Sequence, residues 1–115
     1  MKLLLAIIQP TKLQAVREAL DQVGVQRLTV CDAQGYGRQR GQTASYRGIE
    51  YKINMLRKVS LEIWVNDDFV ERTIEVLLQV AKTGTQGNIG DGKVFVLPTE
   101  DALTIDGGAR GPGAV

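Results

Sequence analysis

Segments with the apolar pattern of a strand alternate along this chain with segments that have the apolar pattern of a helix. The order of these segments constrains the fold more than any other feature of the sequence. The apolar run Leu3–Ile8 predicts a buried strand over residues 2–8, and apolar residues at helical spacing from 13 to 23 predict a helix after it. Residues 59–65 alternate apolar and polar side chains, as a strand does, and a second helical stripe follows. That stripe consists of Val70, Ile74, Leu77, Leu78 and Ala81. Each half of the chain therefore begins with a strand that leads into a helix.

A further strand follows each helix, at residues 25–33 after the first and at 94–97 after the second, and residues 102–105 can form another. The order strand–helix–strand thus occurs twice. It predicts an α+β, ferredoxin-like βαββαβ domain, in which an antiparallel sheet carries two helices on one face. The first strand is apolar on both of its faces, although a face exposed to water does not need apolar residues. We therefore expect the open face of the sheet to be buried in a homo-oligomer.

Local signals mark the ends of both helices. Thr11 and Gln14 predict a capping box at the start of the first helix, and Gly24 is placed to end it. Asn66 predicts the N-cap of the second helix, which we expect to end near Gly84. The two helices are therefore bounded independently of their apolar stripes.

Composition limits the functions open to this domain. A chain of 115 residues is one domain, and its net charge of +1 gives no support for general nucleic-acid binding. The chain has no histidine, which removes the commonest general base and metal ligand. A single cysteine, Cys31, excludes an internal disulfide and is expected to be a small buried side chain in a strand. The apolar run Leu3–Ile8 is too short for a signal peptide, so we expect a cytoplasmic protein.

Between the two halves lies a segment without apolar periodicity, residues 34–54, which is rich in glycine and contains all three tyrosines. Segments of this length without secondary structure are uncommon in compact domains and are usually functional or disordered. The cations around it are explained either by a solvated loop or by an anionic ligand. Arg38 and Lys58 bracket the two ends of the segment, where the flanking strands hold them close, and this favours an anionic ligand. The cations are Arg38, Arg40, Arg47, Arg57 and Lys58.

A second glycine-rich segment follows the second helix, at residues 83–93. Its last four residues, GDGK, combine closely approachable backbone amides with a cation, which suits a phosphate. It is not a P-loop, because Val94 stands where that motif needs Ser or Thr. A tight turn between helix and strand explains the same residues equally well. The domain is expected to end at about residue 106, with residues 107–115 forming a flexible, disordered tail.

The two glycine-rich segments resemble the two signatures of the PII family of signalling proteins. The segment GYGRQRGQTASYRGIEY resembles the T-loop of the family, and YRGIEY at residues 46–51 resembles its first signature. TG…IGDGKVFV at residues 83–96 resembles the second. The resemblance runs from Met1 to about Asp101 and places the T-loop at about 36–54 and the B-loop at about 83–92. Two motifs in the right order and spacing make it specific.

The resemblance implies a compact homotrimer that binds ADP or ATP in clefts between subunits. Its T-loops would control a partner, such as a membrane transporter or a metabolic enzyme, in nitrogen regulation. With ATP, Gln39 would help to hold Mg²⁺, and Gln39 and Lys58 would then bind 2-oxoglutarate. Tyr51 matches a tyrosine that many bacterial relatives modify with a nucleotidyl group. The implied nucleotide-binding residues are Thr29, Gly35, Gly37, Arg38, Gln39, Trp64, Gly90, Asp91, Gly92 and Lys93.

The chain departs from the family pattern in two places. Three extra residues, near Thr85–Asn88, lengthen the loop that should surround the phosphates. An R-x-R pair that reaches the phosphates in the family falls here on Thr104 and Asp106. Each charge-assisted hydrogen bond is worth about 1.5–3 kcal/mol, so we expect ATP to lose more affinity than ADP or AMP. The inserted residues or Arg110 are the candidates to compensate.

Three other functional interpretations of the sequence stay open. A PII-like sensor can bind ADP or AMP but not 2-oxoglutarate, and report bicarbonate or energy state instead. An enzyme that hydrolyses ATP slowly with Lys93 and Mg²⁺ is conceivable, but no paired acids or nucleophile motif supports it. An RNA-recognition domain has the same strand–helix order but stacks bases on aromatics of its central strands, whereas the tyrosines here lie in residues 34–54. We expect a regulator that is not an enzyme.

Overall fold

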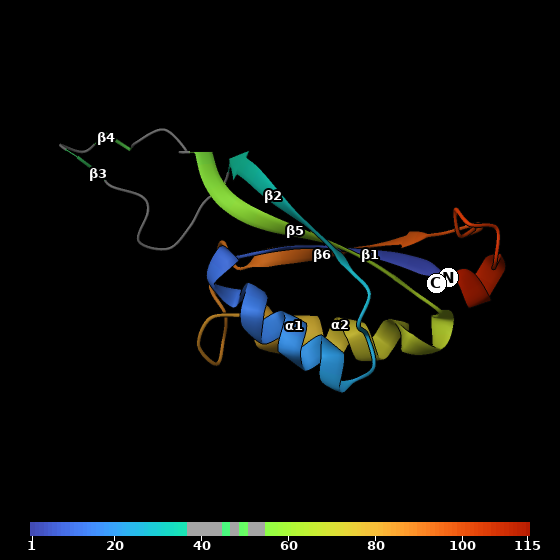
Figure 1. Cartoon of the computed structure of the whole chain (residues 1–115). Coiled ribbons are helices and arrows are strands. Elements are labelled where there is room, and N and C mark those ends of the chain that lie inside the picture. The colour runs from blue at the N-terminus through green and yellow to red at the C-terminus, as the bar shows by residue number, and fades with distance from the viewer. Residues whose placement is uncertain (37–44, 47–48, 51–54) are drawn as a thin grey trace.

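The computed structural model describes residues 1–36, 45–46, 49–50 and 55–115, and Figure 1 shows how their elements are arranged. The main elements are β1 (Lys2–Ile8), α1 (Leu13–Gln22), β2 (Thr29–Tyr36), β5 (Met55–Val65), α2 (Asp67–Ala81) and β6 (Gly92–Pro98). The short elements are 3₁₀ helices at Pro10–Lys12 and Gly111–Ala114 and the paired strands β3 (Ser45–Tyr46) and β4 (Ile49–Glu50). The observed order confirms that each half of the chain is built as strand, helix and strand.

Four strands of the described chain form one antiparallel sheet in the order β2-β5-β1-β6. β1 lies inside the sheet, where Leu4 pairs with Ile63 on one side and with Val96 on the other. Both helices cover the same face of this sheet (Figure 1). The α+β, ferredoxin-like arrangement that the sequence predicts is therefore confirmed.

The core lies between the sheet and the two helices. Alternate residues of β1 and β5 point into it, and Leu4, Leu61 and Ile63 are fully buried. They meet Leu20 of α1 and Leu77 of α2, which are also fully buried. Burying one such side chain contributes about 1.5–3 kcal/mol, so the period-two and helical patterns of the sequence are the main source of stability.

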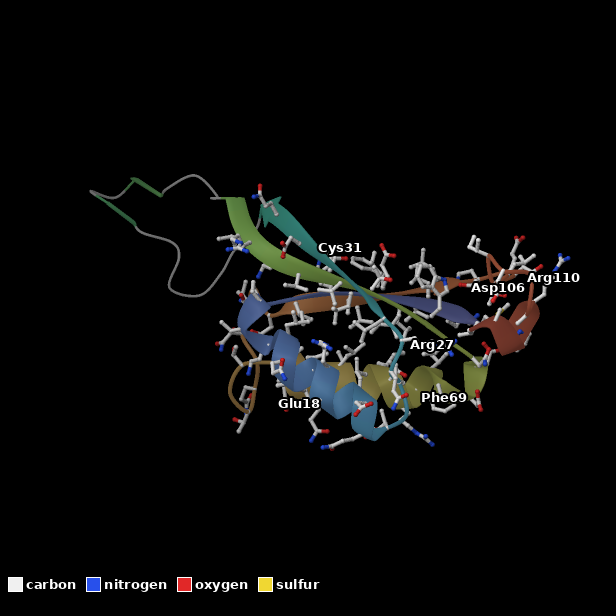
Figure 2. The ribbon with its side chains drawn as sticks, viewed as in Figure 1. Glu18, Arg27, Cys31, Phe69, Asp106 and Arg110 are labelled. Atoms are coloured by element: carbon white, nitrogen blue, oxygen red, sulfur yellow. The ribbon has the colours of Figure 1, made fainter. Side chains whose placement is uncertain are left out.

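The opposite face of the sheet is apolar and uncovered in the single chain. Leu3 of β1 pairs with Trp64 of β5 and with Leu97 of β6, and these two partners are each 40% exposed. Phe95 lies on the same face, paired with Leu5. Cys31 is on the edge strand β2 and is exposed, so the expectation of a buried cysteine is wrong for the single chain (Figure 2). The prediction that a homo-oligomer covers this face stays a prediction.

The first helix starts differently from the prediction. Residues 10–12 form a 3₁₀ turn, so α1 starts only at Leu13 and the predicted capping box does not form. The amide of Gln14 instead donates to the carboxylate of Glu18, one turn further on (2.8 Å). Gly24 ends the helix as predicted, with a φ of 89° that suits glycine and an N–H bonded to the carbonyl of Asp21 (3.0 Å).

The second helix confirms most of its predicted features. Asn66 is the N-cap of α2, although its amide donates to the carbonyl of Pro112 (3.0 Å) instead of capping the helix. The predicted apolar stripe is correct at Val70, Leu77 and Ala81, which are buried. It is wrong at Leu78, whose side chain is 59% exposed in the single chain. The buried face of α2 therefore includes Thr73 and Leu77 and leaves Leu78 outside it.

Strand boundaries shift by a few residues. Val25 does not belong to β2, because its N–H bonds to the carbonyl of Leu20 and its side chain completes the end of α1. β5 starts at Met55, before the alternating pattern becomes clear, and β6 extends over residues 92–98. The expected strand at 102–105 is reduced to one bridge between Leu103 and Arg110.

The chain end differs from the disordered tail that we expected. Residues 111–114 form a 3₁₀ helix, and the N–H of Gly111 bonds to the carbonyl of Ala102 (2.7 Å). The hydrogen bond from Asn66 to Pro112 fixes this segment next to the start of α2. Long-range partners of this kind are not visible in a glycine-rich sequence, which is why composition alone suggests disorder.

Candidate functional site

The candidate binding residues fall into two groups at opposite ends of the sheet. Gly37, Arg38, Gln39 and Tyr51 lie outside the described residues. The register of the strands divides the remaining candidate residues between the two groups. The first group consists of Gly35, Lys58, Gly90, Asp91, Gly92 and Lys93.

The second group contains Thr29 and Trp64. Lys58 and Trp64 are on the same strand, six residues apart, which corresponds to about 20 Å. The two groups are too far apart to surround a phosphate group together within one chain. They form two separate half-sites at opposite ends of β2 and β5, which contribute residues to both.

The first half-site is built around the carbonyl of Gly90, in the loop between α2 and β6. The amide of Gln9, at the end of β1, donates to this carbonyl (2.8 Å). The ammonium group of Lys58, on β5, donates to the same oxygen. Gln9 is a candidate site residue that the sequence does not indicate, because nothing local connects it to a loop 81 residues away. The loop is thus tied to both central strands.

Asp91 closes the inserted part of this loop. Its carboxylate accepts hydrogen bonds from the backbone N–H of Thr83 (2.9 Å), the hydroxyl of Thr83 (2.9 Å) and the backbone N–H of Asn88 (2.8 Å). Desolvation alone would raise the pKa of Asp91, but the hydrogen bonds from Thr83 and Asn88 outweigh it and the pKa is lowered. The extra residues are therefore held in a closed turn by a carboxylate that stays ionised.

Glycine is required at position 92 for packing. A Cβ atom there would lie 1.7 Å from the carbonyl oxygen of Ile7, and the residue has a φ of 122°. Gly92 starts β6 and pairs with Ile8, so the close approach follows from how β6 joins β1. The second glycine of the GDGK sequence thus has a structural role in addition to the predicted ligand contact.

Lys58 is the partly buried cation of this half-site, whereas Lys93 is exposed. Desolvation lowers the pKa of Lys58, and the nearby carboxylate of Asp91 opposes that shift. A partly desolvated ammonium beside the carbonyl of Gly90 is suited to an anion that can replace this acceptor.

The second half-site is a cavity of about 610 Å³ at the other end of the sheet. Thr29 and Trp64, both predicted, lie in its wall. The sequence analysis missed the other walls, which come from the turn after α1 and from the chain end. The charged lining residues are Arg27, Glu62 and Asp101, and the last residue of the chain, Val115, also lines the cavity. A cavity of this size falls in the range of small-ligand pockets.

Thr104 and Asp106 lie close to this cavity in the chain but bond to each other. The hydroxyl of Thr104 donates to the carboxylate of Asp106 (2.7 Å), which also accepts from the N–H of Gly108 (2.8 Å). These bonds lower the pKa of Asp106. The two residues therefore stabilise a turn and offer no cation to a ligand.

Comparison with known proteins decides the family. A family model described as "Nitrogen regulatory protein P-II" matches residues 1–109. The chain belongs to the P-II family. Proteins named Nitrogen regulatory protein P-II from Rhodospirillum rubrum and Azospirillum brasilense are 49% and 48% identical to it. One from Bradyrhizobium diazoefficiens is also 48% identical, and all three alignments cover the whole of both chains.

Two further observations describe this P-II protein. Among the described residues, no group of three or more Cys, Asp or Glu side chains is arranged to hold a metal ion. None of the described helices is long and apolar enough to cross a membrane.

Proposed function

We propose that this P-II protein is a cytoplasmic regulator that binds adenine nucleotides in clefts between the subunits of a homotrimer. The observation that carries the proposal is the separation of its two half-sites by about 20 Å on one chain. A neighbouring subunit supplies the missing half if the apolar sheet face with Trp64 and Phe95 is the subunit contact.

In this arrangement the cavity with Thr29 and Trp64 takes the adenine. Gly35, Gly37, Arg38, Gln39 and the GDGK residues Gly90, Asp91, Gly92 and Lys93 of a neighbour surround the ribose and phosphates. Backbone amides of glycine-rich loops suit anions, which supports this orientation. The segment 36–54 then reports the bound ligand to a partner protein, such as a membrane transporter or a metabolic enzyme in nitrogen regulation. A ligand changes the partner's response only through its different affinity for two states of that segment.

A second version of the function has its own support. Thr104 and Asp106 stabilise a turn, and Lys58 already donates to Gly90. ATP with Mg²⁺, held through Gln39, would have to bind without cations at positions 104 and 106. 2-Oxoglutarate, held through Gln39 and Lys58, would have to replace the carbonyl of Gly90 as the acceptor of Lys58. We therefore propose ADP or AMP as the preferred ligand, and a signal such as bicarbonate or energy state as the alternative to 2-oxoglutarate.

Isothermal titration of the purified protein with ADP, AMP and ATP tests both versions. ADP is expected to bind at least as tightly as ATP, and Lys93→Ala is expected to weaken ADP by roughly tenfold or more. Arg17→Ala, on the exposed side of α1, is the matched control and should bind ADP normally. ATP binding tenfold tighter than ADP would contradict the preference, and the absence of any nucleotide binding would contradict the function. Turnover of ATP that disappears in Lys93→Ala would favour an enzyme instead.

A further inference from the structure

The cavity at the second half-site has an excess of negative charge. Glu62 and Asp101 line it, with Arg27 as the one cation of the described lining. The phosphates of a nucleotide whose adenine lies in this cavity would therefore face net repulsion from its walls unless another cation reached them. From residue 94 to the end of the chain the sequence holds one cation, Arg110, against Glu100, Asp101 and Asp106.

The fold brings Arg110 to the cavity through a short return of the chain. Arg110 forms a backbone bridge with Leu103, which lines the cavity, and the N–H of Thr104 bonds to the carbonyl of Ala109 (3.0 Å). Figure 2 labels Arg110 and Asp106 at the same end of the molecule, and Figure 1 places both termini toward this end. Backbone pairing therefore places the backbone of residue 110 beside Leu103 of the cavity wall, and Arg110 itself is outside the lining.

The side chain of Arg110 is bound to a lining residue. Its Nε and Nη2 atoms both contact Oδ2 of Asp101, at 2.9 and 2.8 Å. The Arg110 side chain is 72% exposed, so this is a solvated ion pair of the kind that contributes little to stability. A guanidinium carries five N–H donors, so it can leave or share this carboxylate at little cost.

We propose that Arg110 is a ligand-binding residue that contacts a phosphate group of the nucleotide whose adenine lies in this cavity, and that Asp101 binds the guanidinium when no ligand is present. The inference rests on the proposed nucleotide binding. A phosphate accepts two parallel hydrogen bonds from guanidinium and carries more charge than one carboxylate, so it competes well for Arg110. Arg110 thus supplies the cation that Thr104 and Asp106 do not.

Two variants of the same ion pair test this proposal, because they give opposite results. Arg110→Gln should weaken ADP roughly tenfold in calorimetry, and Asp101→Asn, which releases the guanidinium, should strengthen ADP binding by a few-fold. Adenosine, which has no phosphate, serves as the control ligand and should bind both variants as it binds the unmodified protein. If the pair only stabilised the chain end, both variants would change ADP binding in the same direction.

The outcomes separate this inference from the function on which it rests. Normal ADP binding by the unmodified protein with unchanged binding by Arg110→Gln would overturn the role of Arg110 alone. Equal losses of ADP and adenosine in Arg110→Gln would also overturn it, since they would indicate damage to the cavity. No binding of ADP or adenosine to the unmodified protein would overturn both the function and the inference.

Discussion

Replacing Gly92 by alanine should destabilise the fold more than any other single methyl addition in the loop 83–92. The new Cβ would lie 1.7 Å from the carbonyl oxygen of Ile7, so β6 or β1 must move by more than about 1 Å. A side chain at a φ of 122° adds conformational strain. Strain of about 1–3 kcal/mol and overpacking of about 1–3 kcal/mol give an expected loss of roughly 3 kcal/mol or more.

Gly84→Ala is the matched control. Gly84 also has a positive φ, 64°, but a Cβ there would meet no described atom within 4 Å. Its alanine variant therefore has the strain without the clash, and should lose only about 1–2 kcal/mol.

Urea unfolding at one fixed protein concentration measures both variants, because assembly would make stability depend on concentration. With slopes of about 1–3 kcal/mol per molar urea, Gly92→Ala should lower the midpoint by about 1 M or more. A midpoint equal to that of Gly84→Ala would refute the reasoning, since it would mean that β6 adapts to the added methyl without cost.

Other predictions follow from individual contacts. Asp91→Asn should destabilise the protein near neutral pH. The pKa of Asp91 in the folded protein is below its unfolded value of 3.8, so the ionised carboxylate stabilises the fold above pH 3.8, and this stabilisation is lost as the pH falls through the folded pKa. The stabilities of the variant and the unmodified protein should therefore converge in acid unfolding. Lys58→Met should speed hydrogen exchange of the amides at 86–91 in mass spectrometry, since it removes a bond that holds the loop; unchanged exchange would contradict this. Leu77→Ala should cost about 2–5 kcal/mol in urea unfolding and Leu78→Ala under about 1 kcal/mol, and equal costs would show that Leu78 is covered in solution.

The fold could be predicted because its main signals are local. The alternation at 59–65 and the helical stripe at 70–81 depend on residues close in sequence, and both appear in the structure as β5 and α2. Val25 misled the strand prediction because an apolar residue that completes a helix end looks like one that starts a strand. Boundaries therefore failed where two elements share an apolar residue.

The candidate site was less predictable because its contacts connect distant segments. The bond from Gln9 to Gly90 spans 81 residues, and the position of Arg110 depends on a return of the chain from Leu103. A glycine-rich tail carries no local sign of either partner. Motifs could thus identify the loop 83–92, but only the structure identifies the strands that hold it and the chain end that lines the cavity.

Mixed trimers test most directly whether each nucleotide site combines the GDGK half of one subunit with the Thr29 half of another. Lys93→Ala damages one half and Thr29→Arg fills the other, so neither variant alone should bind ADP well. Refolding the two variants together in equal amounts should restore about a quarter of the ADP sites, because every mixed trimer then has one interface with both halves intact. No recovery in trimers shown to be mixed would contradict the account, since it would mean that both halves act within one subunit.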